Sequence, residues 1–146
     1  DEYTIVVDTH GKLRWQADEA DGHPLLCIVS EEVPEAYLET LRQQGISWIA
    51  AGKGRIDLPK AMEALSEHFG VKRLAIVGGG HICGGFLEAG LIDEVSIMVA
   101  PGIDGRKGQT AVFDGIADTG CNPFRLKLES VEQWPTDIVW LRYKMK

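Results

Sequence analysis

The chain has 146 residues, of which 45% are hydrophobic, and carries a formal net charge of −7. This length and composition predict one sizeable core and a single domain over residues 1–146. The acidic balance argues against a nucleic-acid surface, which needs clustered Lys and Arg, and no apolar run is long enough to predict a membrane-spanning helix.

The cysteines give an indication of the cellular compartment. Cys27, Cys83 and Cys121 are an odd number and show no C-x-x-C spacing. A disulfide framework is therefore not expected, and a reducing cytoplasm is the simpler interpretation.

Strand and helix patterns alternate along the first half of the chain. Short apolar runs bounded by turn residues predict strands, and apolar residues at helical spacing predict helices. Pro34 suits the first turn of a helix, Asp57 suits an N-cap, and Gly45 and Gly70 suit helix ends. The predicted elements are strands at Thr4–Asp8, Leu25–Val29 and Ile46–Ala50, and helices at Pro34–Gln44 and Asp57–Gly70.

The stretch Leu74–Pro101 has the most distinctive pattern. It predicts a strand at Leu74–Val77, three glycines at 78–80, a short helix that ends at Gly90, and a strand at Val95–Ala100. Glycines allow a ligand to approach the backbone closely, and a helix N-terminus suits a phosphate. The alternative is that the glycines only let the helix pack tightly on the sheet.

The remainder of the chain predicts a loop and a hairpin. Residues 102–123 contain five glycines and few apolar residues, which is typical of a long loop. Phe124–Trp134 and Ile138–Met145 alternate apolar and polar residues around a Pro-Thr-Asp turn, which predicts an antiparallel hairpin. Together the elements predict a mainly parallel sheet followed by this hairpin.

The order of these motifs resembles a known family. A triple glycine is followed after six residues by LEAGLIDE, and then by a strand that ends in Ala-Pro. This combination resembles the dihydrofolate-reductase-like family that includes the C-terminal reductase domain of bifunctional riboflavin-biosynthesis deaminase/reductases. The residues that carry it are Gly78–Gly80, Leu87, Glu88, Gly90, Leu91, Asp93, Glu94, Ala100, Pro101 and Gly105, together with IVVD at 5–8 and GKGRIDL at 52–58.

The resemblance implies an α/β fold of three layers, with a mainly parallel central sheet and a C-terminal antiparallel hairpin. Family members carry a further strand, helix and strand ahead of the IVVD strand. The first strand of this chain begins almost at once, and residue 1 is not methionine. We therefore expect a fold that is incomplete at its N-terminus, in a trimmed or proteolysed chain.

The resemblance also implies NADPH as the cofactor. Gly79, Gly80, His81, Ile82, Cys83 and Gly84 are expected to hold the pyrophosphate, and Ser30 with Arg14 to hold the 2′-phosphate. Family members contact the cofactor at positions that match Leu13–Trp15 and Ile56. The alternatives are a local turn or helix cap for Ser30 and a solvated surface charge for Arg14. The ends of the predicted parallel strands are expected to line one groove.

Neither a metal ion nor a catalytic side chain is predicted. His81 and Cys83 lie two residues apart, but zinc needs three or four ligands and no second pair is near them in the sequence. No His/Asp relay marks Cys83 as a nucleophile. Because the family's substrate contacts lie largely upstream, the catalytic residue stays unknown.

The resemblance implies an NADPH-dependent reductase that transfers hydride to a small heterocyclic or sugar-phosphate substrate. One alternative is 5-amino-6-(5-phosphoribosylamino)uracil reductase, although Gly78 stands where those enzymes tend to have a substrate-binding glutamate. An alternative of another class is a nucleotide-binding module without catalysis. A homodimer is also expected, because Trp134, Trp140 and Tyr143 lie in or beside the terminal hairpin.

Overall fold

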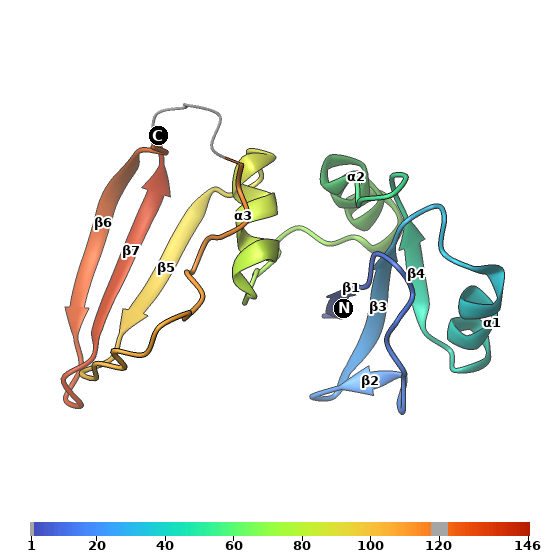
Figure 1. Ribbon diagram of the computed structural model, residues 1–146, viewed down its shortest axis with the longest axis horizontal. Helices are drawn as coiled ribbons and strands as arrows, with labels where there is room; N and C mark the ends of the chain where they lie inside the picture. The colour runs from blue at the N-terminus through green and yellow to red at the C-terminus, as the bar shows by residue number, and fades with distance from the viewer. Residues whose placement is uncertain (1, 118–122) are drawn as a thin grey trace. The chain divides into compact units, whose positions relative to one another are not determined.

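The computed structural model describes residues 2–117 and 123–146 (Figure 1). The chain divides into two compact units, Asp1–Ala75 and Ile76–Lys146. The single domain expected over residues 1–146 stays a prediction. Cys121 and the corresponding part of the predicted loop lie outside the described residues.

The first unit contains a small sheet and two helices, as the hydrophobic pattern predicts. Each strand and helix predicted between Thr4 and Gly70 is confirmed to within two residues at either end. The elements are β1 (Thr4–Val7), β2 (Glu19–Ala20), β3 (His23–Val29), α1 (Glu35–Gln43), β4 (Ser47–Ala50) and α2 (Leu58–Phe69).

The sheet of the first unit is mainly parallel, with β3 at its centre. β1 and β4 both pair with β3 in parallel, in the registers Thr4↔Leu25 and Leu26↔Ser47. β2 is antiparallel to β3 and was not predicted. Asp21 and Gly22 join these two strands with φ angles of 53° and 78°, as a type I′ turn requires.

Strand β3 supplies apolar side chains to both faces of this sheet. Leu25, Cys27 and Val29 belong to a buried cluster that includes Tyr37 and Leu41 of α1. Leu26 and Ile28 belong to a second cluster, which includes Ala61 and Leu65 of α2. The first unit therefore has one helix on each face of its sheet, because successive strand residues point in opposite directions.

The helix ends of the first unit follow the predicted capping residues. The side chain of Asp57 accepts a hydrogen bond from the Lys60 amide at 3.1 Å at the start of α2. Gly70 ends α2 in the left-handed conformation, with a φ of 66°. Pro34 is the N-cap of α1, and Gly45 follows the C-cap of that helix with a φ of 74°.

The second unit consists of a short helix and a three-stranded antiparallel sheet. The sheet has the order β5-β7-β6, and the predicted terminal hairpin is confirmed as β6 and β7. The hairpin turn contains Asp137, whose amide donates to the Trp134 carbonyl at 3.1 Å. The elements are α3 (Gly80–Glu88), β5 (Glu94–Val99), β6 (Leu126–Gln133) and β7 (Val139–Met145).

The strand predicted at Leu74–Val77 is wrong. Residues 71–79 form neither strand nor helix, and Val77 is 97% exposed. An apolar run becomes a strand only when a neighbour satisfies its backbone groups, and no ladder among the described residues includes this run. β5 pairs with β7 in an antiparallel manner, so the parallel unit predicted around the glycines is also not formed.

The chain thus has an α/β fold with two sheets and three helices in the described residues. Of the helices described, none combines the length and the apolar character needed to cross a bilayer.

Candidate functional site

Three of the predicted strand ends lie together in the first unit. β1, β3 and β4 are adjacent parallel strands, so their C-terminal ends share one edge of the sheet. The Ser30 amide donates to the Thr9 carbonyl at 3.3 Å, and the Glu31 amide donates to the Gly52 carbonyl at 2.8 Å. These bonds join the three segments that follow the strands into one rim, which is where ligands bind in open parallel sheets.

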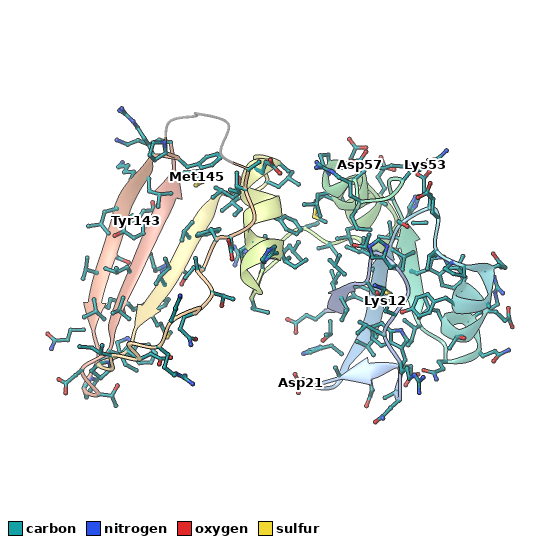
Figure 2. All side chains as sticks on the ribbon, viewed as in Figure 1. Lys12, Asp21, Lys53, Asp57, Tyr143 and Met145 are labelled. Carbon is teal, nitrogen blue, oxygen red and sulfur yellow. The ribbon has the colours of Figure 1, made fainter. Side chains whose placement is uncertain are left out.

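Figure 2 shows the two ends of the first unit through its labelled side chains. Lys53 and Asp57 lie at the end where β4 stops, and Asp21 lies at the opposite end beside β2. The loop between Lys53 and Asp57 is tight because the Asp57 amide donates to the Ala51 carbonyl at 3.1 Å. A Cβ atom at Gly52 would lie 2.4 Å from the Arg55 carbonyl oxygen, so this loop requires glycine there.

A buried carboxylate organises the segment after β1. Asp8 is only 7% exposed, and its two carboxylate oxygens accept the amides of Lys12 and Leu13 at 3.0 and 2.8 Å. The Tyr37 hydroxyl of α1 also donates to Asp8, at 2.8 Å. That hydroxyl in turn accepts the indole N–H of Trp15 at 2.7 Å. We name these four contacts the Asp8 cluster; they fix residues 9–15 against α1.

The protonation states of the Asp8 cluster follow from these contacts. Burial alone would raise the pKa of the Asp8 carboxyl, but hydrogen bonds from Leu13, Lys12 and Tyr37 outweigh it and lower this pKa below 3.8. Burial raises the pKa of the Tyr37 hydroxyl well above its ordinary value. Burial also raises the pKa of the nearby Cys27 thiol to about 11, so that this thiol is neutral and unsuited to nucleophilic attack.

The predicted cofactor residues of the first unit divide into exposed and buried ones. Leu13 is 45% exposed and Arg14 is also exposed. The loop that carries them is nevertheless held in place by its hydrogen bonds to the buried Asp8 carboxylate. Ile56 is half-buried against the cluster on the α2 face. Ser30 is buried, and its hydroxyl oxygen accepts the Glu32 amide at 3.3 Å. The local-turn interpretation of Ser30 therefore has a structural basis, while its role toward a 2′-phosphate stays a prediction.

In the second unit, the triple glycine leads into α3 as predicted. Gly78 has a φ of 125°, which side chains with a Cβ rarely adopt, and the Gly78–Gly79 peptide bond is cis. Gly79 is the N-cap, and its carbonyl accepts the Cys83 amide at 3.0 Å. The amides of Gly80, His81 and Ile82 precede this first intrahelical bond, so the positive end of the helix dipole lies at these residues.

The packing role considered for the glycines is also observed, but the partner is a loop segment and not a sheet. A Cβ atom at Gly80 would lie 2.4 Å from the Ala111 carbonyl oxygen, and one at Gly84 would lie 1.9 Å from that of Asp114. The Asp114 amide donates to the Gly80 carbonyl at 3.0 Å. The side chains of His81 and Asp114 approach to 4.0 Å. Close packing therefore requires glycine at positions 80 and 84, independently of any bound ligand.

The other predicted residues of α3 differ in accessibility. His81 is exposed and Ile82 is half-buried, whereas Cys83 is buried. Gly79 is exposed, and a Cβ atom added there would meet nothing within 4 Å. The residues most accessible to a phosphate at this helix start are thus Gly79 and His81.

Sequence reasoning missed the Asp8 cluster. From the sequence, Asp8 ends a predicted strand and belongs to the IVVD motif, and Tyr37, 29 positions away, lies within the predicted helix Pro34–Gln44. A partial signal was present, because an acidic residue directly after an apolar strand and three positions before Gly11 is typical of a turn in which the carboxylate binds backbone amides. Within residues 2–117 and 123–146, no group of three or more His, Cys, Asp or Glu side chains is arranged to hold a metal ion.

Comparison with curated proteins gives relatives with a named activity. A 2,5-diamino-6-ribosylamino-4(3H)-pyrimidinone 5′-phosphate reductase from Methanothermobacter thermautotrophicus is 31% identical over 127 residues, which cover 86% of this chain and 57% of that protein. A protein of the same name from Archaeoglobus fulgidus is 30% identical over 91 residues, or 62% of this chain and 40% of that protein. The chain thus spans about half the length of the curated relatives it matches.

Solved structures show the same fold. A pyrimidine reductase-like protein from Corynebacterium diphtheriae superposes with a TM-score of 0.80 at 21% identity, covering 99% of this chain and 61% of that one. RibD from Acinetobacter baumannii superposes with a TM-score of 0.74 at 21% identity, covering 97% of this chain and 37% of that one. The family model described as RibD C-terminal domain matches residues 3–140. The resemblance inferred from the glycine and LEAGLIDE motifs is therefore confirmed, and the chain belongs to the RibD C-terminal domain family.

Proposed function

We propose that the chain is the reductase part of an NADPH-dependent enzyme that reduces a ribosylaminopyrimidine 5′-phosphate. The observation that carries this proposal is the family match over residues 3–140, together with curated relatives that are named as reductases of such a compound. That substrate is both a heterocycle and a sugar phosphate, which fits the substrate class expected from the sequence. Among the alternatives there, the riboflavin-pathway reductase is the one that the relatives favour.

NADPH supplies the hydride, and the protein's part is to bind and orient the two reactants face to face. In the second unit, we assign the pyrophosphate to the start of α3, where the amides of Gly80, His81 and Ile82 precede the first intrahelical bond. In the first unit, we assign Leu13, Arg14, Ser30 and Ile56 to cofactor contacts at the rim after β1, β3 and β4. We name no catalytic residue.

The proposal is tested first by cofactor binding. Substituting Gly80 by glutamate is an ambiguous test, because a Cβ atom there would already clash with Ala111. His81 is a better position, because its side chain is 77% exposed and lies in the first turn of α3. His81→Glu places a negative charge beside the proposed phosphate, and His81→Gln is the matched control of similar size without that charge.

We expect NADPH to bind the wild-type chain and the His81→Gln variant in the micromolar range, and His81→Glu to bind at least about fivefold more weakly. Titration followed by nucleotide fluorescence measures all three. Equal NADPH affinities of the two variants would contradict the assignment of the pyrophosphate to the start of α3. Turnover is then measured with the ribosylaminopyrimidine phosphate. Binding of NADPH without its oxidation would favour the alternative of a nucleotide-binding module without catalysis.

Three further properties belong to the proposal. We propose a three-layer dihydrofolate-reductase-like arrangement over the single domain 1–146, a cytoplasmic location and a homodimer. The two cysteines that the structure describes, Cys27 and Cys83, are free, which supports a reducing compartment. Trp134 contacts Trp140 edge to face at 5.9 Å and stays 40% exposed, which supports the hairpin as a contact surface. A monomeric mass in light scattering at high concentration would count against the dimer.

A further inference from the structure

We infer that the Asp8 cluster is a positioning device that sets the affinity for NADPH from inside the core, without contact between its polar atoms and the cofactor. This inference rests on the proposed function, since it concerns the loop that carries Leu13 and Arg14. Asp8 and Tyr37 thereby become positioning residues, and neither is assigned a contact with the substrate or the cofactor.

The buried carboxylate of Asp8 has hydrogen-bond donors on both of its oxygens. The carboxylate of Asp8 accepts three donors at 2.8 to 3.0 Å, two of them backbone amides from positions 12 and 13. A carboxylate that is 7% exposed is costly to bury, so these bonds offset a large desolvation penalty. The loop conformation that provides the two amides is therefore strongly preferred over others.

Tyr37 of α1 connects that helix to both ends of the loop at residues 9–15. The Tyr37 hydroxyl donates to Asp8 and accepts the indole N–H of Trp15, so one side chain of α1 contacts both the start and the end of the loop. The amide group of Gln44, just after α1, also donates to the Trp15 carbonyl at 3.0 Å. Residues 9–15 are thus held at both ends by one helix.

The loop at residues 9–15 exposes two side chains to solvent. While Asp8 and Trp15 point inward, Leu13 and Arg14 between them remain exposed. A glycine is required at position 11, because a Cβ atom there would lie 2.4 Å from Val33 and 2.8 Å from the Tyr37 ring. The loop therefore lies tightly on α1 and holds its two exposed side chains in one place, which lowers the ordering cost of binding.

The test removes the hydroxyl of Tyr37 and keeps its ring. Tyr37→Phe preserves the packing of the ring in the cluster on the α1 face, but it deprives Asp8 and Trp15 of a partner. Tyr3→Phe is the matched control in the same unit, because the Tyr3 ring packs edge to face on Phe69 at 5.7 Å in the other cluster. We expect about a tenfold weaker NADPH affinity for Tyr37→Phe and no change for Tyr3→Phe.

Two readouts separate positioning from general loss of stability. Hydrogen exchange at the Lys12 and Leu13 amides is expected to speed up in Tyr37→Phe, while exchange in β3 stays unchanged. In a double-mutant cycle, Tyr37→Phe and Arg14→Ala are expected to be non-additive for NADPH affinity, because both act through the same loop. In steady-state assays, KM for NADPH rises and kcat stays the same.

The outcomes distinguish this inference from the proposed function. If the wild-type chain binds neither NADPH nor NADH, the proposed function is contradicted, and the expected effect of Tyr37→Phe on NADPH affinity is contradicted as well. If the wild-type chain binds NADPH and Tyr37→Phe binds it equally well, the inference alone is overturned. Additive effects of Tyr37→Phe and Arg14→Ala, or unchanged exchange at Lys12 and Leu13, would overturn it as well.

Discussion

The two units of the chain differ in how they use their apolar residues. In the first unit, the side chains of β3 lie in two clusters that α1 and α2 cover. Of the large apolar side chains described in this unit, only Leu13 is strongly exposed. In the second unit, apolar side chains on all three strands share one face of the sheet, and those of the edge strand β6 stay exposed: Leu126, Leu128 and Val131.

This difference teaches that a clear hydrophobic pattern predicts a strand in both units but does not predict how deeply that strand is buried. An alternating strand such as β6 and a largely apolar strand such as β3 are both predicted correctly, yet only β3 is enclosed by helices of its own unit. The free energy of folding that can be assigned to local packing is therefore concentrated in the first unit. Six substitutions, two of them matched controls, test how each unit is held together.

The largest effect is expected at the centre of β3. Leu26 is fully buried, so Leu26→Ala should lower the free energy of unfolding by about 2–5 kcal/mol. Leu128→Ala makes the same chemical change on β6, where the side chain is 50% exposed, and should cost less than about 1 kcal/mol. Urea denaturation of both variants gives the two values. Similar losses would mean that the units do not differ in local packing.

The second effect concerns the close packing of Gly84 in α3 against the segment that contains Asp114. Gly84→Ala introduces a Cβ atom 1.9 Å from the Asp114 carbonyl oxygen. We expect a loss of about 1–3 kcal/mol, despite the better helix propensity of alanine. Gly79→Ala is the control, because its backbone is extended and nothing lies within 4 Å of the added atom. If thermal unfolding shows both variants to be equally stable, the packing of residues 111–115 on α3 is not tight.

The third effect depends on pH. The pKa of Asp8 is lower in the folded chain than its ordinary value of 3.8. Its contribution is therefore fully present above pH 3.8 and is lost as the pH falls through the folded pKa. At neutral pH, Asp8→Asn should lower the free energy of unfolding by about 1–2 kcal/mol. Denaturation from pH 7 to pH 2 should show this difference shrinking, and a constant difference would contradict a charged Asp8.

The smallest effect is expected at the rim of the first unit. The ammonium group of Lys60 donates to the Glu31 carboxylate at 2.5 Å, and this bond lowers the pKa of Glu31. Both side chains are partly exposed to water, where salt and side-chain entropy cancel most of the gain. Lys60→Met should leave the unfolding midpoint unchanged within error. A clear loss of stability would show that the rim is held by charge and not by backbone bonds.

Much of the fold could be predicted because its signals are local. Pro34, Asp57 and Gly70 mark the helix ends by backbone chemistry that needs no distant partner. β2 was missed although its Asp21-Gly22 turn is a strong hairpin signal, because a strand of two residues has no periodicity. The strand predicted at Leu74–Val77 failed for the opposite reason, because its apolar pattern is clear but strand formation depends on a partner.

The site was less predictable than the fold. The glycine run at positions 78–80 and Gly84 are visible in the sequence, but the contacts of Gly80 and Gly84 with Asp114 join segments far apart in the chain. The Asp8 cluster brings together three side chains from a strand end, a loop and a helix. Each of these residues has an ordinary local role, so no sequence window reveals that they share a hydrogen-bonded network.

The central position of β3 has a consequence for how the first unit unfolds. Its odd-numbered residues anchor one cluster and its even-numbered residues anchor the other, so neither cluster can open while the strand stays in place. The two layers are therefore coupled into a single cooperative transition. Unfolding of β3 is expected to expose the clusters under α1 and α2 together, whereas the loop after β1 can still open by itself.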